Sequence, residues 1–241
     1  REFMETARVV ASGIREKHEP PDDAQPHLEP LAQEYLRALL ATDRDKAWRI
    51  IDAAVRQGMP IKDIYLHVFQ PTQYEIGRLW QHNRIGVAQE HYCTATTQLI
   101  MSRLYPRLFS GDRKYRRFLG SCVGGELHEL GARMVADFFE MEGWDTRYLG
   151  AGSPEATLLT AVETHQPHVV GLSVTLLAHV RRAEKTIAEI RRHFGSKPII
   201  LVGGRPFNAR KDLWRHVGAD GYGPDAQKAV EQADALVGKA S

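Results

Sequence analysis

The sequence predicts a chain of class α plus α/β, in which a four-helix bundle precedes a doubly wound parallel sheet. Two observations carry this prediction. Apolar residues recur at helical spacing up to about residue 110, with no strand pattern among them. Beyond residue 117, short apolar runs alternate with helical stretches, which is typical of βαβ units. We therefore expect a flexible leader over 1–26, a helix bundle over 27–112 and a sheet domain over 117–238.

Capping and turn residues set the expected limits of the bundle helices. Asp43 is the expected cap of the second helix, and Gly58 ends that helix. Pro60 is expected in the first turn of the third helix, where its missing N–H removes no intrahelical bond. Asn83 and Gly86 then predict the turn that leads into the fourth helix.

Strands and helices alternate through the second half of the chain. Strands are expected at 118–123, 145–149, 168–174, 198–202 and 220–222. Helices are expected after them, at 129–142, 154–164, 179–193, 209–216 and 224–237. Because helical crossovers connect parallel strands, the helices should cover both faces of the sheet.

The composition excludes several functional classes. The 241 residues carry a formal net charge of +2, which is too small to indicate a nucleic-acid-binding surface. No apolar run approaches the roughly 20 residues that span a bilayer, and no secretory signal is present. Cys93 and Cys122 lack metal-site spacing, which indicates a reducing compartment, so we expect a cytoplasmic protein. No catalytic acid, base or nucleophile stands out, so a sensing or binding module is expected rather than an enzyme.

Three loops follow strands of the predicted sheet, where ligands of doubly wound folds bind. Each loop alone has an ordinary structural interpretation, since loop histidines and glycine pairs are common. Together they predict a crevice with one imidazole, small hydroxyl groups and an open glycine floor. The loops are Glu126-Leu127-His128-Glu129-Leu130-Gly131, Ser173-Val174-Thr175 and Gly203-Gly204.

This arrangement resembles the cobalamin-binding domain of methionine synthase and the corrinoid mutases. That family has Asp-x-His-x-x-Gly, then Ser-x-Leu, then Gly-Gly, at separations similar to those between Gly131, Ser173 and Gly203. The resemblance extends over 117–238 and includes Gly218-Ala219-Asp220-Gly221-Tyr222. It implies a Rossmann-like fold that binds cobalamin, with His128 as the protein ligand on the lower face of the cobalt.

The resemblance also implies roles for the residues around His128. Glu126 stands where the family has an aspartate that fixes the tautomer of the ligating imidazole. Ser173 and Thr175, the latter in place of the family's leucine, would hydrogen-bond the buried nucleotide tail of the cofactor. Gly203 and Gly204 would let the backbone approach that tail closely. The remaining expected cofactor contacts are Leu127, Glu129, Gly131, Gly221 and Tyr222.

The bundle carries a second motif, in which Trp80 is followed by Glu90-His91. This motif is similar to the signature of the cobalamin-dependent photoreceptors of the CarH/LitR type. The resemblance implies that Trp80 stacks on a 5′-deoxyadenosyl group, that Glu90 accepts from its ribose hydroxyls and that His91 lies alongside. The alternative is that Trp80 belongs to the bundle core. Those regulators have a histidine directly after the tryptophan, where this chain has Gln81, and His82 lies about 100° further around a helix.

We therefore expect a light sensor that holds adenosylcobalamin between the bundle and the sheet domain. Photolysis of the Co–C bond would drive a conformational or oligomeric switch. The leader is too short for the regulators' DNA-binding winged helix, so the expected output is a homo-oligomer such as a dimer, or a separate output protein. Photocobilins, which pair cobalamin with a bilin such as biliverdin, share this architecture. Candidate cations for bilin propionates are Arg78, His82, Arg84 and Arg205.

Two alternatives use the same cofactor differently. A corrinoid methyl carrier of a methyltransferase system would share His128 and the bundle, but its cap must open to admit other proteins. An adenosylcobalamin mutase is ranked last, because it needs a separate substrate barrel of about 250 residues.

Overall fold

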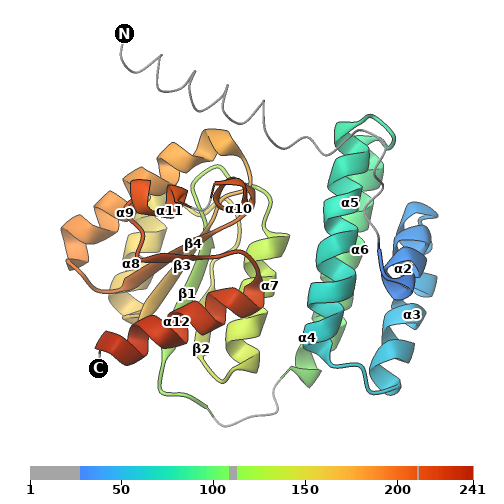
Figure 1. Ribbon diagram of the computed structural model, residues 1–241, viewed down its shortest axis with the longest axis horizontal. Coiled ribbons are helices and arrows are strands. Elements are labelled where there is room, and N and C mark those ends of the chain that lie inside the picture. Colours follow the sequence, from blue (N-terminus) through green and yellow to red (C-terminus); the bar gives the residue numbers. More distant parts are fainter. Residues whose placement is uncertain (1–27, 109–112, 211, 241) are drawn as a thin grey trace.

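The computed structural model describes residues 28–108, 113–210 and 212–240. The predicted leader over 1–26 lies outside the described residues. Figure 1 shows two parts side by side, a bundle of helices and a sheet covered by helices. This arrangement confirms the predicted fold class, an N-terminal helical part followed by a Rossmann-like parallel-sheet domain.

The helical part consists of helical segments that follow one another closely. Asp43 caps the second of them as predicted, since its side chain accepts a hydrogen bond from the backbone N–H of Lys46 at 2.8 Å. The segments are α2 (Pro30–Leu40), α3 (Arg44–Arg56), α4 (Ile61–Ile64), the π-helix η1 (Tyr65–Phe69), α5 (Gln70–Gln81), α6 (Val87–Leu104) and the 3-10 helix η2 (Tyr105–Arg107).

The third predicted helix differs from the expectation in two ways. Pro60 lies before the first turn, with extended backbone, and the helix begins at Ile61. The helix also contains the π-helical turn η1, whose extra residue shifts the direction in which neighbouring side chains point. Tyr65 consequently contacts the ring of Phe138 in the sheet domain, whereas Phe69 contacts the ring of Tyr35 inside the bundle.

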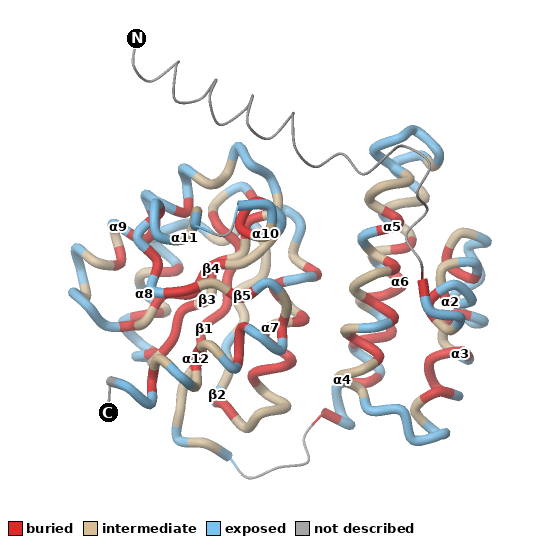
Figure 2. The backbone as a smooth tube through the Cα atoms, viewed as in Figure 1, coloured by how far each residue is buried: buried red, intermediate tan, exposed pale blue. Residues whose placement is uncertain are grey.

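The sheet has five parallel strands in the order β2-β1-β3-β4-β5. This is one of the two common strand orders of doubly wound folds, and it places β1 and β3 in the centre. β1 is buried from Phe118 to Cys122, and β3 is buried except at Gly171 and Ser173, which are half-buried (Figure 2). The strands are β1 (Arg117–Cys122), β2 (Asp145–Tyr148), β3 (Val169–Ser173), β4 (Ile199–Gly203) and β5 (Gly221–Gly223).

Helices cover both faces of this sheet. The sheet separates two hydrophobic cores. One core joins α7 and α12 to the interior of the bundle, and the other lies beneath α8 and α9. The covering segments are α7 (Leu130–Met141), α8 (Glu155–His165), the 3-10 helix η3 (Leu177–His179), α9 (Val180–Phe194), α10 (Arg205–Ala209), α11 (Leu213–His216) and α12 (Ala226–Ala240).

The predicted helix at 209–216 is wrong in its extent. The segment after β4 forms two short helices, α10 and α11, and α10 begins immediately after Gly204. Pro206 occupies the first turn of α10, which favours a helix start there rather than at residue 209. None of the helices described in 28–108, 113–210 and 212–240 is long and apolar enough to cross a membrane.

Candidate functional site

The register of the sheet brings the three predicted loops together. Cys122, the last residue of β1, pairs with Ser173 of β3, and Ser173 pairs with Gly203 of β4. Backbone bonds continue this contact beyond the strands, because the N–H of Val123 donates to the carbonyl oxygen of Ser173. The loops after β1, β3 and β4 therefore meet at one edge of the sheet, as the topology of a parallel sheet requires.

Glu126 is the centre of the hydrogen bonds at this edge. Its side chain is 0% exposed, and each carboxylate oxygen accepts from more than one donor. Oε1 accepts from the Nδ1 of His128 at 2.5 Å and from the backbone N–H of His128 at 3.1 Å. Oε2 accepts from the backbone N–H groups of Thr175 and Leu176 at 2.9 and 3.1 Å, and from the Nδ1 of His179 at 3.0 Å.

These donors keep the buried carboxylate ionised. Burial by itself raises the pKa of Glu126, because it penalises the charged form. Hydrogen bonds from His128 and His179 and from backbone N–H groups outweigh this effect and lower the pKa to about 2. At neutral pH the carboxylate can thus act as a fixed acceptor for the imidazole of His128.

The imidazole of His128 has one nitrogen fixed and one nitrogen available. Its side chain is 52% exposed, and Nδ1 is occupied by Glu126. When Nδ1 carries the proton, Nε2 has a free lone pair, which is the form that binds a metal. Leu127 and Leu176 flank this site with large exposed apolar side chains, 75% and 45% exposed. An imidazole donor within an apolar rim fits the lower face of a corrin ring.

The other predicted residues at this edge of the sheet differ in whether contacts within the protein already occupy them. Ser173 and Thr175 lie beside His128's loop, although it is the backbone of Thr175 that contacts Glu126. Gly131 lies in the first turn of α7 with open space where a side chain would be, so a ligand can approach it. Glu129 uses its carboxylate within the protein, accepting from Gln98 and from the backbone N–H of Ala151.

The predicted glycines at 204 and 221 have structural roles that do not depend on a ligand. Gly204 has φ +108, and a Cβ there would lie 2.0 Å from the carbonyl oxygen of Val174. The backbone of Gly204 therefore lies in close contact with the loop after β3. Gly221 is buried within β5, and Tyr222 packs against the second core. Cofactor contacts at these positions remain predictions.

The bundle motif lies at the turn between α5 and α6. Trp80 is 44% exposed, which contradicts an interpretation as a buried core residue. Glu90 accepts from the hydroxyl of Thr94 at 3.0 Å, and its other oxygen lies 2.5 Å from the Nδ1 of His91. Figure 1 shows this turn at the same end of the molecule as the carboxyl ends of the strands. The turn between α5 and α6 therefore lies at the same end of the molecule as the loops that follow the strands.

A polar interface joins the bundle to α7. Four residues of or beside α7, spaced three or four apart, each bond a residue of the helical part, which places them on one face of the helix. The pairs are Glu129 with Gln98 (3.0 Å), Arg133 with Ser102 (2.8 Å), Asp137 with Tyr65 (2.7 Å) and Glu140 with Tyr105 (3.1 Å). Apolar contacts accompany these hydrogen bonds, because one hydrophobic core continues from α7 into the bundle and the rings of Tyr65 and Phe138 are in contact.

Asp137→Asn tests the charge buried in this interface. Burial raises the pKa of Asp137, and the hydrogen bond from Tyr65 and the charge of Arg133 only partly oppose it. The folded protein therefore binds this proton more tightly than the unfolded chain, so Asp137 lowers stability as pH rises through this range. The asparagine variant keeps an acceptor for Tyr65 without the charge. We expect its free energy of unfolding, relative to the parent, to increase from acidic to neutral pH, as measured by urea denaturation; a constant difference would contradict this.

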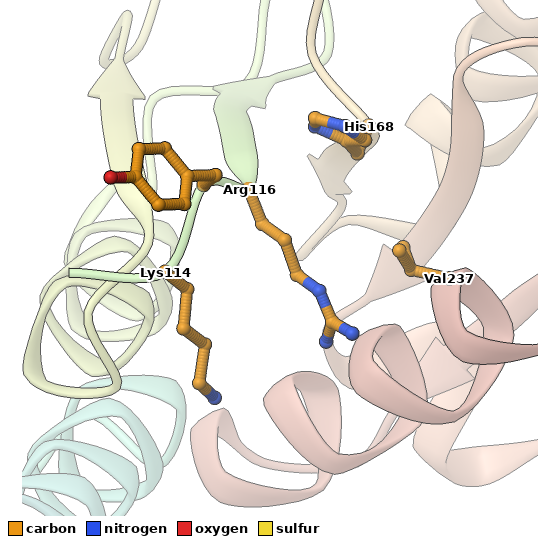
Figure 3. A pocket seen from close by; sticks show the side chains of 5 residues that line it. Lys114, Arg116, His168 and Val237 are labelled. Carbon is orange, nitrogen blue, oxygen red and sulfur yellow. The ribbon is translucent and has the colours of Figure 1, made fainter. Parts of the chain in front are cut away.

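A cavity lies at the opposite edge of the sheet from His128 (Figure 3). The side chains of Lys114 and Arg116 point towards α12, where both pair with Asp234, at 3.1 and 2.5 Å. Their charge is largely compensated within the protein, so we assign no ligand to this cavity. Its volume is about 430 Å³, and it is lined by Lys114, Tyr115, Arg116, His168 and Val237.

Comparison with known proteins shows which ligand the sheet domain binds. Two family models, both described as a B12 binding domain, match residues 116–231 and residues 31–105. Residues 116–231 are a cobalamin-binding domain. The site built around His128 and Glu126 lies within this domain, at the edge where its strands end.

Relatives of the cobalamin-binding domain include regulators and corrinoid proteins. HTH-type transcriptional repressor CarH of Myxococcus xanthus is 27% identical over 183 residues, 76% of this chain and 60% of CarH. The match thus spans less than two thirds of CarH. Dimethylamine corrinoid protein 3 of Methanosarcina acetivorans is 20% identical over 213 residues, 87% of this chain and 98% of that protein.

A solved structure shares the two-part fold. The monomethylamine corrinoid protein of Methanosarcina barkeri superposes with a TM-score of 0.75 at 16% sequence identity, covering 84% of this chain and 96% of that one. At this identity the likeness shows the fold alone.

One side chain of the candidate site, His179, was not among the residues predicted from the sequence. It lies at the end of η3, 53 residues after Glu126 in the chain, and bonds Glu126 directly. One signal was available, because His179 follows the third strand, where ligand-site residues gather. The helical pattern over 179–193 predicts it only as the first residue of a helix.

Proposed function

We propose that the chain is a cobalamin-dependent light sensor, in which the bundle covers the upper face of a cofactor held by His128. The observation that carries this proposal is the exposed side chain of Trp80 near the end of α5, which is joined by a short turn to the start of α6, where Glu90 and His91 lie. The similarity to CarH supports it.

In this proposal each residue has a defined task. Adenosylcobalamin supplies a cobalt–carbon bond that visible light cleaves. His128 holds the cobalt through Nε2, and Glu126 fixes the tautomer that makes Nε2 a donor of electrons. Trp80 covers the adenosyl group, and Glu90 accepts from its hydroxyls. Loss of that group would leave Trp80 without its partner, and the hydrogen bonds between α7 and the bundle would rearrange as the bundle shifts.

The test is the absorbance spectrum of the protein reconstituted with adenosylcobalamin, in darkness and after illumination, combined with size-exclusion chromatography. We expect both the spectrum and the oligomeric state to change. Cyanocobalamin, which lacks the adenosyl group, should produce no change of oligomeric state. A band at wavelengths beyond the corrin absorption, in protein purified with its native chromophores, would indicate a bilin in addition.

A matched pair of variants tests the task of Trp80. Trp80→Ala should abolish the preference for adenosylcobalamin over cyanocobalamin, whereas Tyr74→Ala, at another exposed aromatic position of α5, should retain it. Equal preference in both variants would contradict the proposed cap.

A corrinoid methyl carrier is the second candidate. The match to dimethylamine corrinoid protein 3 covers 98% of that protein, which includes both the bundle and the sheet domain. The two candidates differ in ligand choice. A carrier should prefer methylcobalamin and give up its methyl group to an acceptor substrate held by a methyltransferase, and a light sensor should do neither.

A further inference from the structure

A chain of polar side chains crosses the interior of the bundle and ends at Glu90. It begins at Tyr35 of α2, whose hydroxyl lies 2.9 Å from the hydroxyl of Thr97 of α6. Gln73 of α5 contacts two threonines of α6: its Nε2 donates to Thr97 at 2.9 Å, and its Oε1 lies 3.1 Å from the hydroxyl of Thr94. The hydroxyl of Thr94 also lies 3.0 Å from Oε1 of Glu90. We call these residues the bundle network: Tyr35, Gln73, Glu90, Thr94 and Thr97.

The bundle network is buried at one end and reaches the surface at the other. Tyr35 and Thr97 are both 0% exposed, whereas the side chain of Glu90 is 24% exposed. Buried polar groups are costly unless each has a partner, and a fully bonded network restricts the positions of the helices that carry it. Because the bundle network joins α2, α5 and α6, the position of Glu90 depends on three helices rather than on α6 alone.

The number of protons in the bundle network determines the direction of its hydrogen bonds. A hydroxyl has one proton, so Thr94 cannot donate to Glu90 and to Oε1 of Gln73 at the same time. A carboxylate only accepts, whereas an amide can turn and present its NH2 group to Thr94. Thr97 then exchanges the carbonyl oxygen of Cys93 for that of Gln73 as its acceptor. With the amide turned, every bond points towards the carboxylate, in the order Tyr35, Thr97, Gln73, Thr94 and Glu90.

The bonds within the protein leave Glu90 with capacity for a ligand. Oε1 is the acceptor for Thr94, and Oε2 lies 2.5 Å from Nδ1 of His91. A carboxylate has about four lone-pair sites, so about two remain, one on each oxygen. Two acceptors on one carboxylate suit two neighbouring hydroxyl groups, such as those of a ribose. The directions of these remaining sites depend on where Thr94 and His91 hold the carboxylate.

We propose that Thr94 and Gln73 are positioning residues that determine ligand specificity: they hold the carboxylate of Glu90 so that its remaining lone pairs meet the hydroxyl groups of an adenosyl ligand. Their role rests on the proposed function, because it deepens the task given there to Glu90. Neither Thr94 nor Gln73 contacts the ligand in this assignment. The consequence is a preference for adenosylcobalamin over a cobalamin whose upper ligand has no hydroxyl groups.

Isosteric variants separate the hydrogen bonds of the bundle network from the shapes of its side chains. Thr94→Val replaces the hydroxyl by a methyl group, whereas Thr94→Ser retains the hydroxyl. Gln73→Glu replaces the NH2 group by an acceptor, which draws the proton of Thr94 away from Glu90. Thr160→Val is the matched control, because Thr160 is exposed on α8 and its hydroxyl donates to the carbonyl oxygen of Ala156.

The measurement is the Kd of the full chain for adenosylcobalamin and for propylcobalamin, in darkness. Both ligands have a cobalt–carbon bond, but the propyl group has no hydroxyl. We expect Thr94→Val and Gln73→Glu to bind adenosylcobalamin about 10-fold more weakly, the loss that corresponds to one hydrogen bond to a charged group, with an unchanged Kd for propylcobalamin. Thr94→Ser and Thr160→Val should bind both ligands as tightly as the parent protein does.

Glu90→Ala shows which statement fails when an expected result is not obtained. An unchanged preference for adenosylcobalamin in Glu90→Ala would overturn the task of Glu90 in the proposed function, and the role of Thr94 and Gln73 with it. A reduced preference in Glu90→Ala together with an unchanged preference in Thr94→Val or Gln73→Glu would overturn the role of Thr94 and Gln73 alone. Equal weakening of both ligands in Thr94→Val would overturn it too, because the bundle as a whole would then be affected. If one of the two variants does not fold, the other decides.

Discussion

His128→Ala is expected to weaken cobalamin binding by at least about 10-fold, the loss that follows even from changing a residue that only orients a metal ligand. The imidazole combines a fixed Nδ1, 2.5 Å from a buried carboxylate, with an available Nε2. Alanine removes the donor to cobalt and one of the donors to Glu126. Equilibrium titration with cobalamin, followed by absorbance, measures the change in Kd.

The matched control is His216→Ala. His216 is exposed on α11 and bonds only the segment around Asp212. We expect its Kd for cobalamin to equal that of the parent protein. If His128→Ala binds cobalamin as tightly as His216→Ala does, then His128 is not the lower ligand, and another residue at the sheet edge has to be sought.

Gly204→Ala is expected to lower the free energy of unfolding by about 3 kcal/mol or more. The backbone has φ +108 and ψ 177, a region that is essentially restricted to glycine. A Cβ would also lie 2.0 Å from the carbonyl oxygen of Val174, a backbone atom that cannot move aside cheaply. Because Val174 precedes Thr175, the strain would also disturb the donors to Glu126.

Gly77→Ala provides the control for this effect. Gly77 lies within α5 and has no positive φ, and a Cβ added to it would meet no atom within 4 Å. Alanine should therefore stabilise the protein by about 0.5–1 kcal/mol, the ordinary gain within a helix. Urea denaturation of the two variants measures both changes. Similar stability of the Gly204 and Gly77 variants would show that the turn after β4 tolerates a side chain.

The fold class was predictable because both parts have strong periodic patterns. The alternation after residue 117 predicted five strands and their parallel arrangement, and all five are present. Asp43 was predictable as a cap because capping depends on neighbouring residues alone. The π-turn at Tyr65–Phe69 was not predictable, since it depends on the contacts of Tyr65 with α7. The division between the short helices α10 and α11 was missed as well: one helix was predicted over 209–216, although Pro206 favours a helix start at residue 205.

The candidate site was only partly predictable. The motif around His128 indicated a cobalt ligand, and the family comparison supports the cobalamin-binding domain that contains it. Whether Glu126 reaches the imidazole was undecided by the motif, because an extra methylene group changes both reach and direction. The hydrogen bond between Oε1 and Nδ1 answers this for the folded chain.

The sequence by itself therefore determined the order of helices and strands, the edge of the sheet where a ligand is expected and the choice of His128 as the candidate cobalt ligand. These properties depend on local spacing and on the rule that parallel strands end at one edge. Only the tertiary structure decided how His128 is held. Glu126 bonds residues 49 to 53 positions away, and such contacts exist only after β1, β3 and α9 have packed together.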